Sequence, residues 1–255
     1  MTGNTPSSIR LVLDDRVARL TLDRPDRHNA FTSADVGGFH EALDTIERSD
    51  ARVVLLTGSG DRTFSSGAAL DEMESGAMDG ARFTTMTNRL SHLPLPTVCA
   101  LNGRVYGGGG ELALSCDFRI GSPTVSLKVT AAALGIGYPL EGIVRYVTRL
   151  GPGAAARVLL AAEEIDGPEL HRLGFLTHLV AAESVQTEAD ALAGRLAGLA
   201  PMAVQAMKRV IARAAEGSLD PDEANSWLEA CATSEDVREG LAAWRERRDP
   251  DFEGR

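Results

Sequence analysis

At the start of the chain, apolar residues follow first a strand pattern and then a helical pattern. Two β-rich runs, residues 9–13 and 17–22, flank the turn Asp14-Asp15-Arg16, and this arrangement predicts a hairpin. After it, Ser33 can cap a helix. The apolar residues of that helix recur at spacings of three and four: Val36, Phe39, Leu43 and Ile46.

The next segments continue as strand, helix and strand. Residues 52–57 (RVVLLT) form a short, strongly apolar run closed by glycine and serine, which is typical of a buried strand. A helix near 81–90 and a strand at 97–101 follow. This order predicts an α/β core.

Beyond Gly151 the pattern becomes helical. Four stretches are rich in Ala, Leu, Glu and Arg: 154–162, 185–199, 203–216 and 221–248. No linker rich in Pro, Gly or Ser separates them from the core. We therefore predict a core over 1–195 and a helical region over 196–255 that belongs to the same structural unit.

Composition narrows the range of partners. The 255 residues carry a formal net charge of -10, which disfavours nucleic acid and anionic membranes because both are bound through clustered Lys and Arg. A local basic pocket would still suffice for a small anionic ligand. The apolar stretch 129–140 is too short to span a bilayer, and the first residues lack the features of a secretory signal.

Cysteine and histidine usage predicts neither disulfides nor a metal site. Cys99, Cys116 and Cys231 are odd in number and widely spaced, so we expect the protein to be located in the reducing cytoplasm. The five histidines show no metal-ligand spacing, and no prosthetic group is expected.

The most unusual local feature is the run 107–110 of four glycines, followed by Glu111. Glycines let a ligand approach the backbone closely, although they also permit close packing of a helix on a strand. A phosphate loop would need Lys followed by Ser or Thr after its last glycine, and a carboxylate would repel phosphate. The run therefore indicates a different kind of ligand site.

A second glycine-containing loop, 64–70 (FSSGAAL), follows the predicted buried strand. Alone it could be a tight turn, but ligands of open α/β sheets bind at the carboxyl ends of strands. Two such loops could each offer one backbone N–H to a single oxygen, forming an oxyanion hole.

With these motifs in their order, the sequence resembles the enoyl-CoA hydratase/isomerase (crotonase) family. Residues 24–30 (RPDRHNA) are similar to its RPxxxNA signature, and 53–70 to its strand plus FSAGADL loop. Residues 102–117 resemble its NGxxxGGGxELAxxCD segment. The resemblance covers essentially the whole chain.

The resemblance implies an α/β fold, a crotonase-like spiral of repeated ββα units with a helical C-terminal trimerisation region. It also implies a homotrimer or a dimer of trimers, with an acyl-CoA thioester as substrate and coenzyme A as part of that substrate. The thioester oxygen would lie between the backbone N–H groups of Ala68 and Gly108. These donors would stabilise an enolate.

The acid/base pair departs from the family pattern. Family hydratases hold water between two glutamates; one matches Glu111, and the other matches Ala131, which cannot transfer a proton. Two residues nearby could replace it: Glu141, and Tyr138 where the family has proline. Each has an ordinary alternative, a surface glutamate or a packed tyrosine.

The resemblance also implies residues that bind coenzyme A. The expected set is Arg27, Ala30, Ala68, Ala69, Leu70, Asp71, Gly108, Leu228 and Arg247. In the family, the positions of Leu228 and Arg247 reach a neighbouring subunit's ligand. As a solvated helix charge, Arg247 could equally have no defined role.

Two functions remain open. The first is an enoyl-CoA hydratase or isomerase that works through an enolate, with Glu111 transferring the proton. The second is an acyl-CoA-binding homologue with little or no turnover, because Ala131 removes half of the usual catalytic pair.

Overall fold

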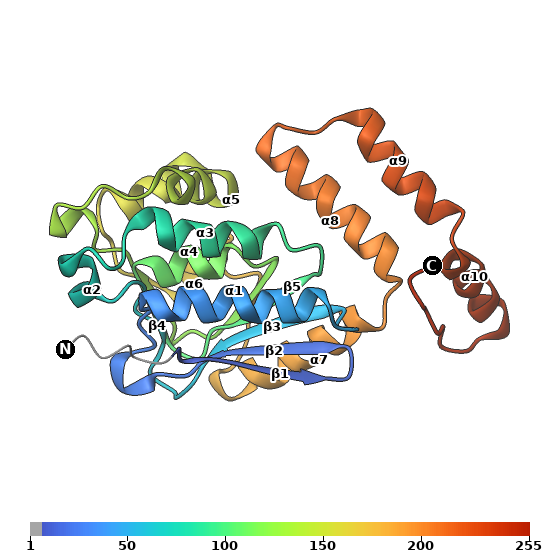
Figure 1. Ribbon diagram of the computed structural model, residues 1–255, viewed down its shortest axis with the longest axis horizontal. Coiled ribbons are helices and arrows are strands. Elements are labelled where there is room, and N and C mark those ends of the chain that lie inside the picture. Colours follow the sequence, from blue (N-terminus) through green and yellow to red (C-terminus); the bar gives the residue numbers. More distant parts are fainter. Residues whose placement is uncertain (1–6) are drawn as a thin grey trace.

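The computed structural model describes residues 7–255, and two sheets form its centre (Figure 1). The first sheet has the order β1-β2-β3-β5-β7-β10, and all its neighbours are parallel except the hairpin β1–β2. Its strands are β1 (Ile9–Asp14), β2 (Val17–Leu22), β3 (Val53–Gly58), β5 (Thr97–Ala100), β7 (Phe118–Gly121) and β10 (His178–Leu179). The predicted hairpin is confirmed.

The second sheet is smaller and is built from the strands that the first sheet skips. Its order is β4 (Thr63–Ser65), β6 (Arg104–Tyr106), β8 (Ser126–Lys128) and β9 (Ile165–Asp166). The chain therefore places β3 in the first sheet and β4 in the second, and repeats this with β5 and β6 and with β7 and β8. A helix follows each pair, which confirms the predicted spiral of ββα units.

Helices cover both sheets (Figure 1). Those of the core are α1 (Ser33–Glu47), α2 (Leu70–Ser75), α3 (Gly80–Ser91), α4 (Gly108–Leu114), α5 (Leu140–Leu159), α6 (Gly167–Arg172) and α7 (Val185–Ala197). Thr32, not Ser33, caps α1: its hydroxyl accepts the Asp35 N–H, and the Asp35 carboxylate accepts the Thr32 N–H. Ser33 is instead the first residue of the helix.

The strand β3 is buried on both faces, as its apolar run predicts. Val54 and Leu56 belong to the main core, which also contains the apolar face of α1. Val53 and Leu55 face the opposite side, where Ala189 of α7 packs against them. This double coverage is the reason that β3 shows no alternation of polar and apolar residues.

Helices α8 (Pro201–Glu216), α9 (Pro221–Ala232) and α10 (Glu235–Glu246) extend to one side of the sheets (Figure 1). The predicted helical stretch 221–248 is two helices, because the chain turns at Thr233 and the Ser234 hydroxyl caps α10 through the Val237 N–H. Within residues 7–255, no helix is long and apolar enough to cross a membrane.

Candidate active site

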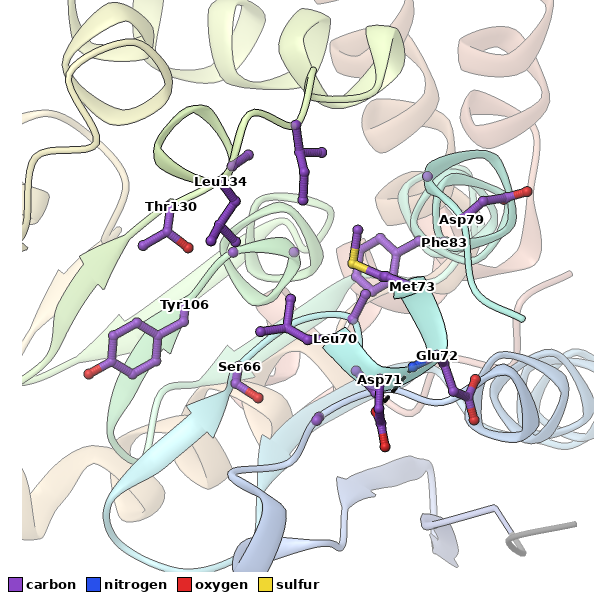
Figure 2. A pocket seen from close by; sticks show the side chains of 18 of the residues that line it. Ser66, Leu70, Asp71, Glu72, Met73, Asp79, Phe83, Tyr106, Thr130 and Leu134 are labelled. Carbon is purple, nitrogen blue, oxygen red and sulfur yellow. Dashed lines mark hydrogen bonds between the residues drawn. The ribbon is translucent and has the colours of Figure 1, made fainter. Parts of the chain in front are cut away.

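A cavity of about 910 Å³ opens beside α2, α3 and α4 (Figure 2). Leu70, Met73, Phe83 and Leu134 line it with apolar side chains, and Ser66, Tyr106 and Thr130 add polar groups. The cavity therefore combines an apolar wall with a few polar groups, which is typical of a site for a small organic ligand.

Most of the predicted site residues meet at this cavity. They are Arg27, Ala30, Ala68, Ala69, Leu70, Asp71, Gly108, Glu111 and Tyr138, and Ala131 lines it too. Glu141 is exposed at the start of α5 and is not part of the lining. Leu228 and Arg247 belong to the C-terminal helical region and are also outside the lining, so their predicted contacts stay predictions.

The two glycine-containing loops touch each other at the cavity. A methyl group built on Gly67 would lie only 2.5 Å from the Gly108 nitrogen, and Gly67 has a φ of 81°. Both facts require glycine at this position. The close approach brings the backbone of the FSSGAAL loop against the first residue of α4.

Two backbone N–H groups at this contact have no acceptor among the described residues. On either side of Ala68, the chain pairs with Phe31: the Phe31 N–H donates to the Gly67 oxygen and the Ala69 N–H to the Phe31 oxygen, both at 2.8 Å. The Ala68 N–H therefore points away from Phe31. Gly108 is the first residue of α4, where N–H groups have no partner within the helix.

Asn29 forms hydrogen bonds with the loop that carries Ala68 and with the residues before it. Its side-chain amide donates to the oxygens of Ser59, at 3.0 Å, and Thr63, at 2.9 Å. Its main-chain oxygen accepts the Ser65 hydroxyl at 2.9 Å, and that hydroxyl accepts the Gly67 N–H at 3.1 Å. Asn29 thus supports the loop; its place in the RPxxxNA signature is the sequence signal for this role, although Asn29 was not among the predicted site residues.

Glu111 is the buried carboxylate of the cavity, with only 1% of the residue exposed. Its Oε1 accepts the Thr87 hydroxyl and an Arg145 guanidinium N–H, each at 2.8 Å. Burial raises the pKa of Glu111 above its usual value, while Thr87 and Arg145 act in the opposite direction. Glu111 is therefore a carboxylate poised to accept or release a proton.

Tyr138 lies on the other side of the Glu111 carboxylate. A methyl group built on Gly142 would be 2.5 Å from Tyr138 Cε1 and 2.7 Å from Glu111 Oε2, so the tyrosine ring and Oε2 border the same small space. The Tyr138 hydroxyl is buried and has no partner among the described residues. Burial raises its pKa well above the usual value, so the phenol stays protonated.

The other carboxylates of the lining are in different surroundings. Asp26, Asp71 and Asp79 are exposed, and Glu72 is half-buried and accepts the Ser33 N–H at 2.6 Å. Among the residues that the structure describes, no group of His, Cys, Asp or Glu side chains could hold a metal ion. Glu111 and Tyr138 are therefore the two candidates for proton transfer inside the cavity.

Comparisons with known proteins identify the family of this chain. The model of the enoyl-CoA hydratase/isomerase family matches residues 13–255, so the chain belongs to this family of enzymes. It is 30% identical to a short-chain-enoyl-CoA hydratase from Clostridium acetobutylicum, covering 95% of this chain and 96% of the relative.

Two further matches support the same assignment. A carnitinyl-CoA dehydratase from Citrobacter koseri is 30% identical, covering 94% of this chain and 95% of the relative. The crystal structure of an enoyl-CoA hydratase from Bacillus anthracis superposes with a TM-score of 0.90 at 27% identity, covering 98% of this chain and all of that one. The fold and the family are thus established along nearly the full length.

Proposed function

We propose that this enzyme acts on an enoyl-CoA thioester through an enolate, with Glu111 as the proton-transferring group. The observation that carries the proposal is a buried carboxylate with one oxygen fixed, which lines the same cavity as two unpartnered backbone N–H groups. Relatives named as hydratases of short-chain enoyl-CoA and crotonyl-CoA support this substrate class.

The two N–H groups of Ala68 and Gly108 would bind the thioester oxygen. Negative charge develops on this oxygen when the Cα proton is removed or when water adds at Cβ. Donors fixed in advance stabilise such charge, and the loss of one typically costs about 10²- to 10³-fold in rate. Because both are main-chain groups, they do not depend on a particular side chain at position 68, whereas a methyl group on Gly108 would lie 2.7 Å from the Phe83 ring.

Tyr138 would supply the group that Ala131 lacks. Its protonated hydroxyl can donate a hydrogen bond to a water molecule and orient that water beside Glu111 Oε2. Isomerisation of a double bond needs one carboxylate that removes and returns a proton, whereas hydration uses a second group to position water. The cavity thus favours isomerisation with Glu111 alone and permits hydration with Tyr138.

The alternative, an acyl-CoA-binding homologue with little turnover, is favoured by one observation: Ala131 lines the cavity at the position that matches the second glutamate. The two functions differ in turnover and not in binding. Coenzyme A would enter both as part of the ligand.

The test is turnover of crotonyl-CoA, followed by the loss of its absorbance, together with isomerisation of a 3-enoyl-CoA. We expect turnover in the wild type and a loss of 10²-fold or more in Glu111→Gln. Glu74→Gln, an exposed carboxylate of α2 outside the cavity lining, is the matched control and keeps the wild-type rate. Tight binding of CoA esters without turnover of either substrate would establish the alternative.

A further inference from the structure

Glu111 is joined to two other helices by side chains that lie outside the cavity lining. Thr87 belongs to α3, Glu111 to α4 and Arg145 to α5, and all three meet at Glu111 Oε1. Arg145 is not part of the cavity lining, and its side chain is 10% exposed. It therefore reaches the site only through the glutamate.

The guanidinium of Arg145 is itself held in one orientation. One of its terminal nitrogens, Nη1, donates to Glu111 Oε1 at 2.8 Å and to the Thr87 hydroxyl at 3.2 Å. The other, Nη2, donates to Asn88 Oδ1 at 2.7 Å and to the Ser91 hydroxyl at 3.4 Å. A planar fork with donors on both nitrogens is a feature that lysine cannot reproduce.

The two oxygens of the Glu111 carboxylate therefore have different environments. Oε1 accepts both hydrogen bonds that the described residues donate to Glu111, whereas Oε2 lies beside Gly142 and Tyr138. A buried ion pair is a weak means of stabilising a fold, because desolvation offsets much of the attraction. In this pair the carboxylate itself lines the cavity, so the arginine fixes how Glu111 faces a ligand.

We propose that Arg145 is a positioning residue that fixes Glu111 through Oε1 and keeps it ionised, so that Oε2 is the atom that takes the substrate proton. The proposal rests on the proton-transfer role proposed for Glu111. It goes beyond that role, because it assigns the protonation state and the reactive oxygen to a residue on another helix.

Other charged or titratable groups near Glu111 are few. From α5 and the residues before it come Arg145, Tyr146 and Tyr138, and burial raises the pKa of both tyrosines, so both stay neutral. Strand β6 also packs against α4; its Arg104 is exposed and its Tyr106 lines the cavity. The group from α3 is the uncharged Thr87. Arg145 is therefore the cation in direct contact with Glu111.

The experiment measures kcat/KM against pH in the wild type, Arg145→Gln and Arg145→Lys. Removal of a cation in contact with a carboxylate raises the pKa of that carboxylate by about 1 to 3 units. The midpoint of the acid limb should therefore move upward by about that amount in Arg145→Gln, and at neutral pH the rate should fall by 10-fold or more. Arg145→Lys should restore much of the midpoint but only part of the rate.

Arg149→Gln is the matched control. Arg149 lies one turn further along α5 and carries the same charge, and no hydrogen bond or ion pair joins it to Glu111 among the described residues. The midpoint of the acid limb in Arg149→Gln should stay close to that of the wild type. A purely structural role of Arg145 would lower the melting temperature and leave the midpoint unmoved, and an unmoved midpoint would overturn the proposal.

A second readout separates this proposal from the proposed function. The Glu111 carboxyl carbon can be titrated by NMR in protein labelled with ¹³C glutamate, with Glu111→Gln identifying its signal. The titration needs no turnover, and its midpoint should be higher in Arg145→Gln and in Thr87→Val than in the wild type. If the wild type turns over no enoyl-CoA, the proposed function fails; if these midpoints coincide, only the role of Arg145 fails.

Discussion

Glu111 and Tyr138, the two groups proposed to take part in proton transfer, differ in their surroundings. The glutamate is ionisable and held by Thr87 and Arg145, whereas the tyrosine hydroxyl is buried without a partner. A buried hydroxyl without a hydrogen bond costs stability, so its presence beside a carboxylate favours a role with substrate or water. The structure thus separates the two candidates for the missing group, because Tyr138 lines the cavity and Glu141 does not.

We expect Tyr138→Phe to lower kcat for hydration by about 10²-fold and to leave KM nearly unchanged, because the ring remains and only the donor is lost. The melting temperature should hold or rise, since an unpaired buried hydroxyl disappears. Steady-state kinetics and calorimetry measure both. Glu141→Gln is the companion variant, and a larger loss of kcat there than in Tyr138→Phe would reverse the choice between them.

Asp35 is another buried carboxylate, and its contacts are structural. It pairs with Arg24 at 2.6 Å and accepts hydrogen bonds from Ser8 and Thr32. Burial alone would raise its pKa, but these hydrogen bonds outweigh burial and lower the pKa below its usual value. The lowered pKa means that the ionised form stabilises the fold.

The variant Asp35→Asn should therefore lower the free energy of unfolding by about 3 kcal/mol at neutral pH, since a neutral amide replaces the buried carboxylate of the ion pair. The sign with pH follows from the lowered pKa: the stabilisation is complete above the pKa of the unfolded chain and is lost as the pH falls through the lower folded value. Urea unfolding measures the free energy of unfolding of both proteins, and the difference between Asp35→Asn and the wild type should be smaller near pH 3 than at pH 7. Asp61→Asn, at an exposed site, should show no such difference at either pH.

At the scale of elements, the sequence predicted those whose pattern is long or strongly apolar. The hairpin β1–β2, the strand β3 and helices α1 and α3 all lie where the periodicity places them. Strands β4, β6 and β8 have three residues each, too few to show a period, and the second sheet was recognisable only through the family resemblance.

The candidate site was predicted in the same uneven way. Ala68, Gly108 and Glu111 lie in contiguous motifs, so their meeting at one cavity follows from the order of the loops. Thr87 and Arg145 lie 24 and 34 residues from Glu111 in helices without any motif, and only the packing of α3, α4 and α5 brings them together. No local pattern records such a contact.

Packing between α5 and the cavity gives a further prediction. In Gly142→Ala the new methyl group would lie 2.5 Å from Tyr138 Cε1 and 2.7 Å from Glu111 Oε2, so one of these groups must move. A displacement of about 1 Å in an active site can cost 10²-fold in rate, and we expect kcat/KM to fall by 10-fold or more.

Gly153→Ala, in the part of α5 that follows the kink at Gly151, is the control, because a methyl group there meets no atom within 4 Å. It should keep the activity and leave the melting temperature unchanged or slightly higher. Equal activity in the two variants would show that the space between Tyr138 and Glu111 is not constrained.

At the scale of the whole molecule, the C-terminal helices expose an apolar surface that the sheets do not cover. In α10, Val237, Leu241 and Trp244 recur at spacings of four and three and are 38%, 58% and 80% exposed. These spacings place the three side chains on one face of the helix. Apolar surface of this kind marks an interaction site, and the helices that carry it stand to one side of the core (Figure 1).

We expect this face to pack between copies of the chain in a homotrimer or a dimer of trimers. The predicted CoA contacts of Leu228 and Arg247 depend on such assembly, because neither residue lines the cavity of its own chain. Arg247→Gln should then raise KM for CoA esters several-fold and leave kcat nearly unchanged, as measured by steady-state kinetics. An unchanged KM would separate Arg247 from the ligand.

Trp244→Asp tests the assembly itself. The wild type should sediment at three or six times the chain mass of 27.0 kDa, and the variant should shift to smaller species because a charge buried in an apolar interface is costly. Glu246→Ala, on the opposite side of α10, should leave the sedimentation unchanged. A wild type that sediments as a monomer would exclude this face as a contact between copies. A Trp244→Asp variant that forms the same oligomer as the wild type would exclude it too. In either case, a dependence of KM on Arg247 would need an explanation within a single chain.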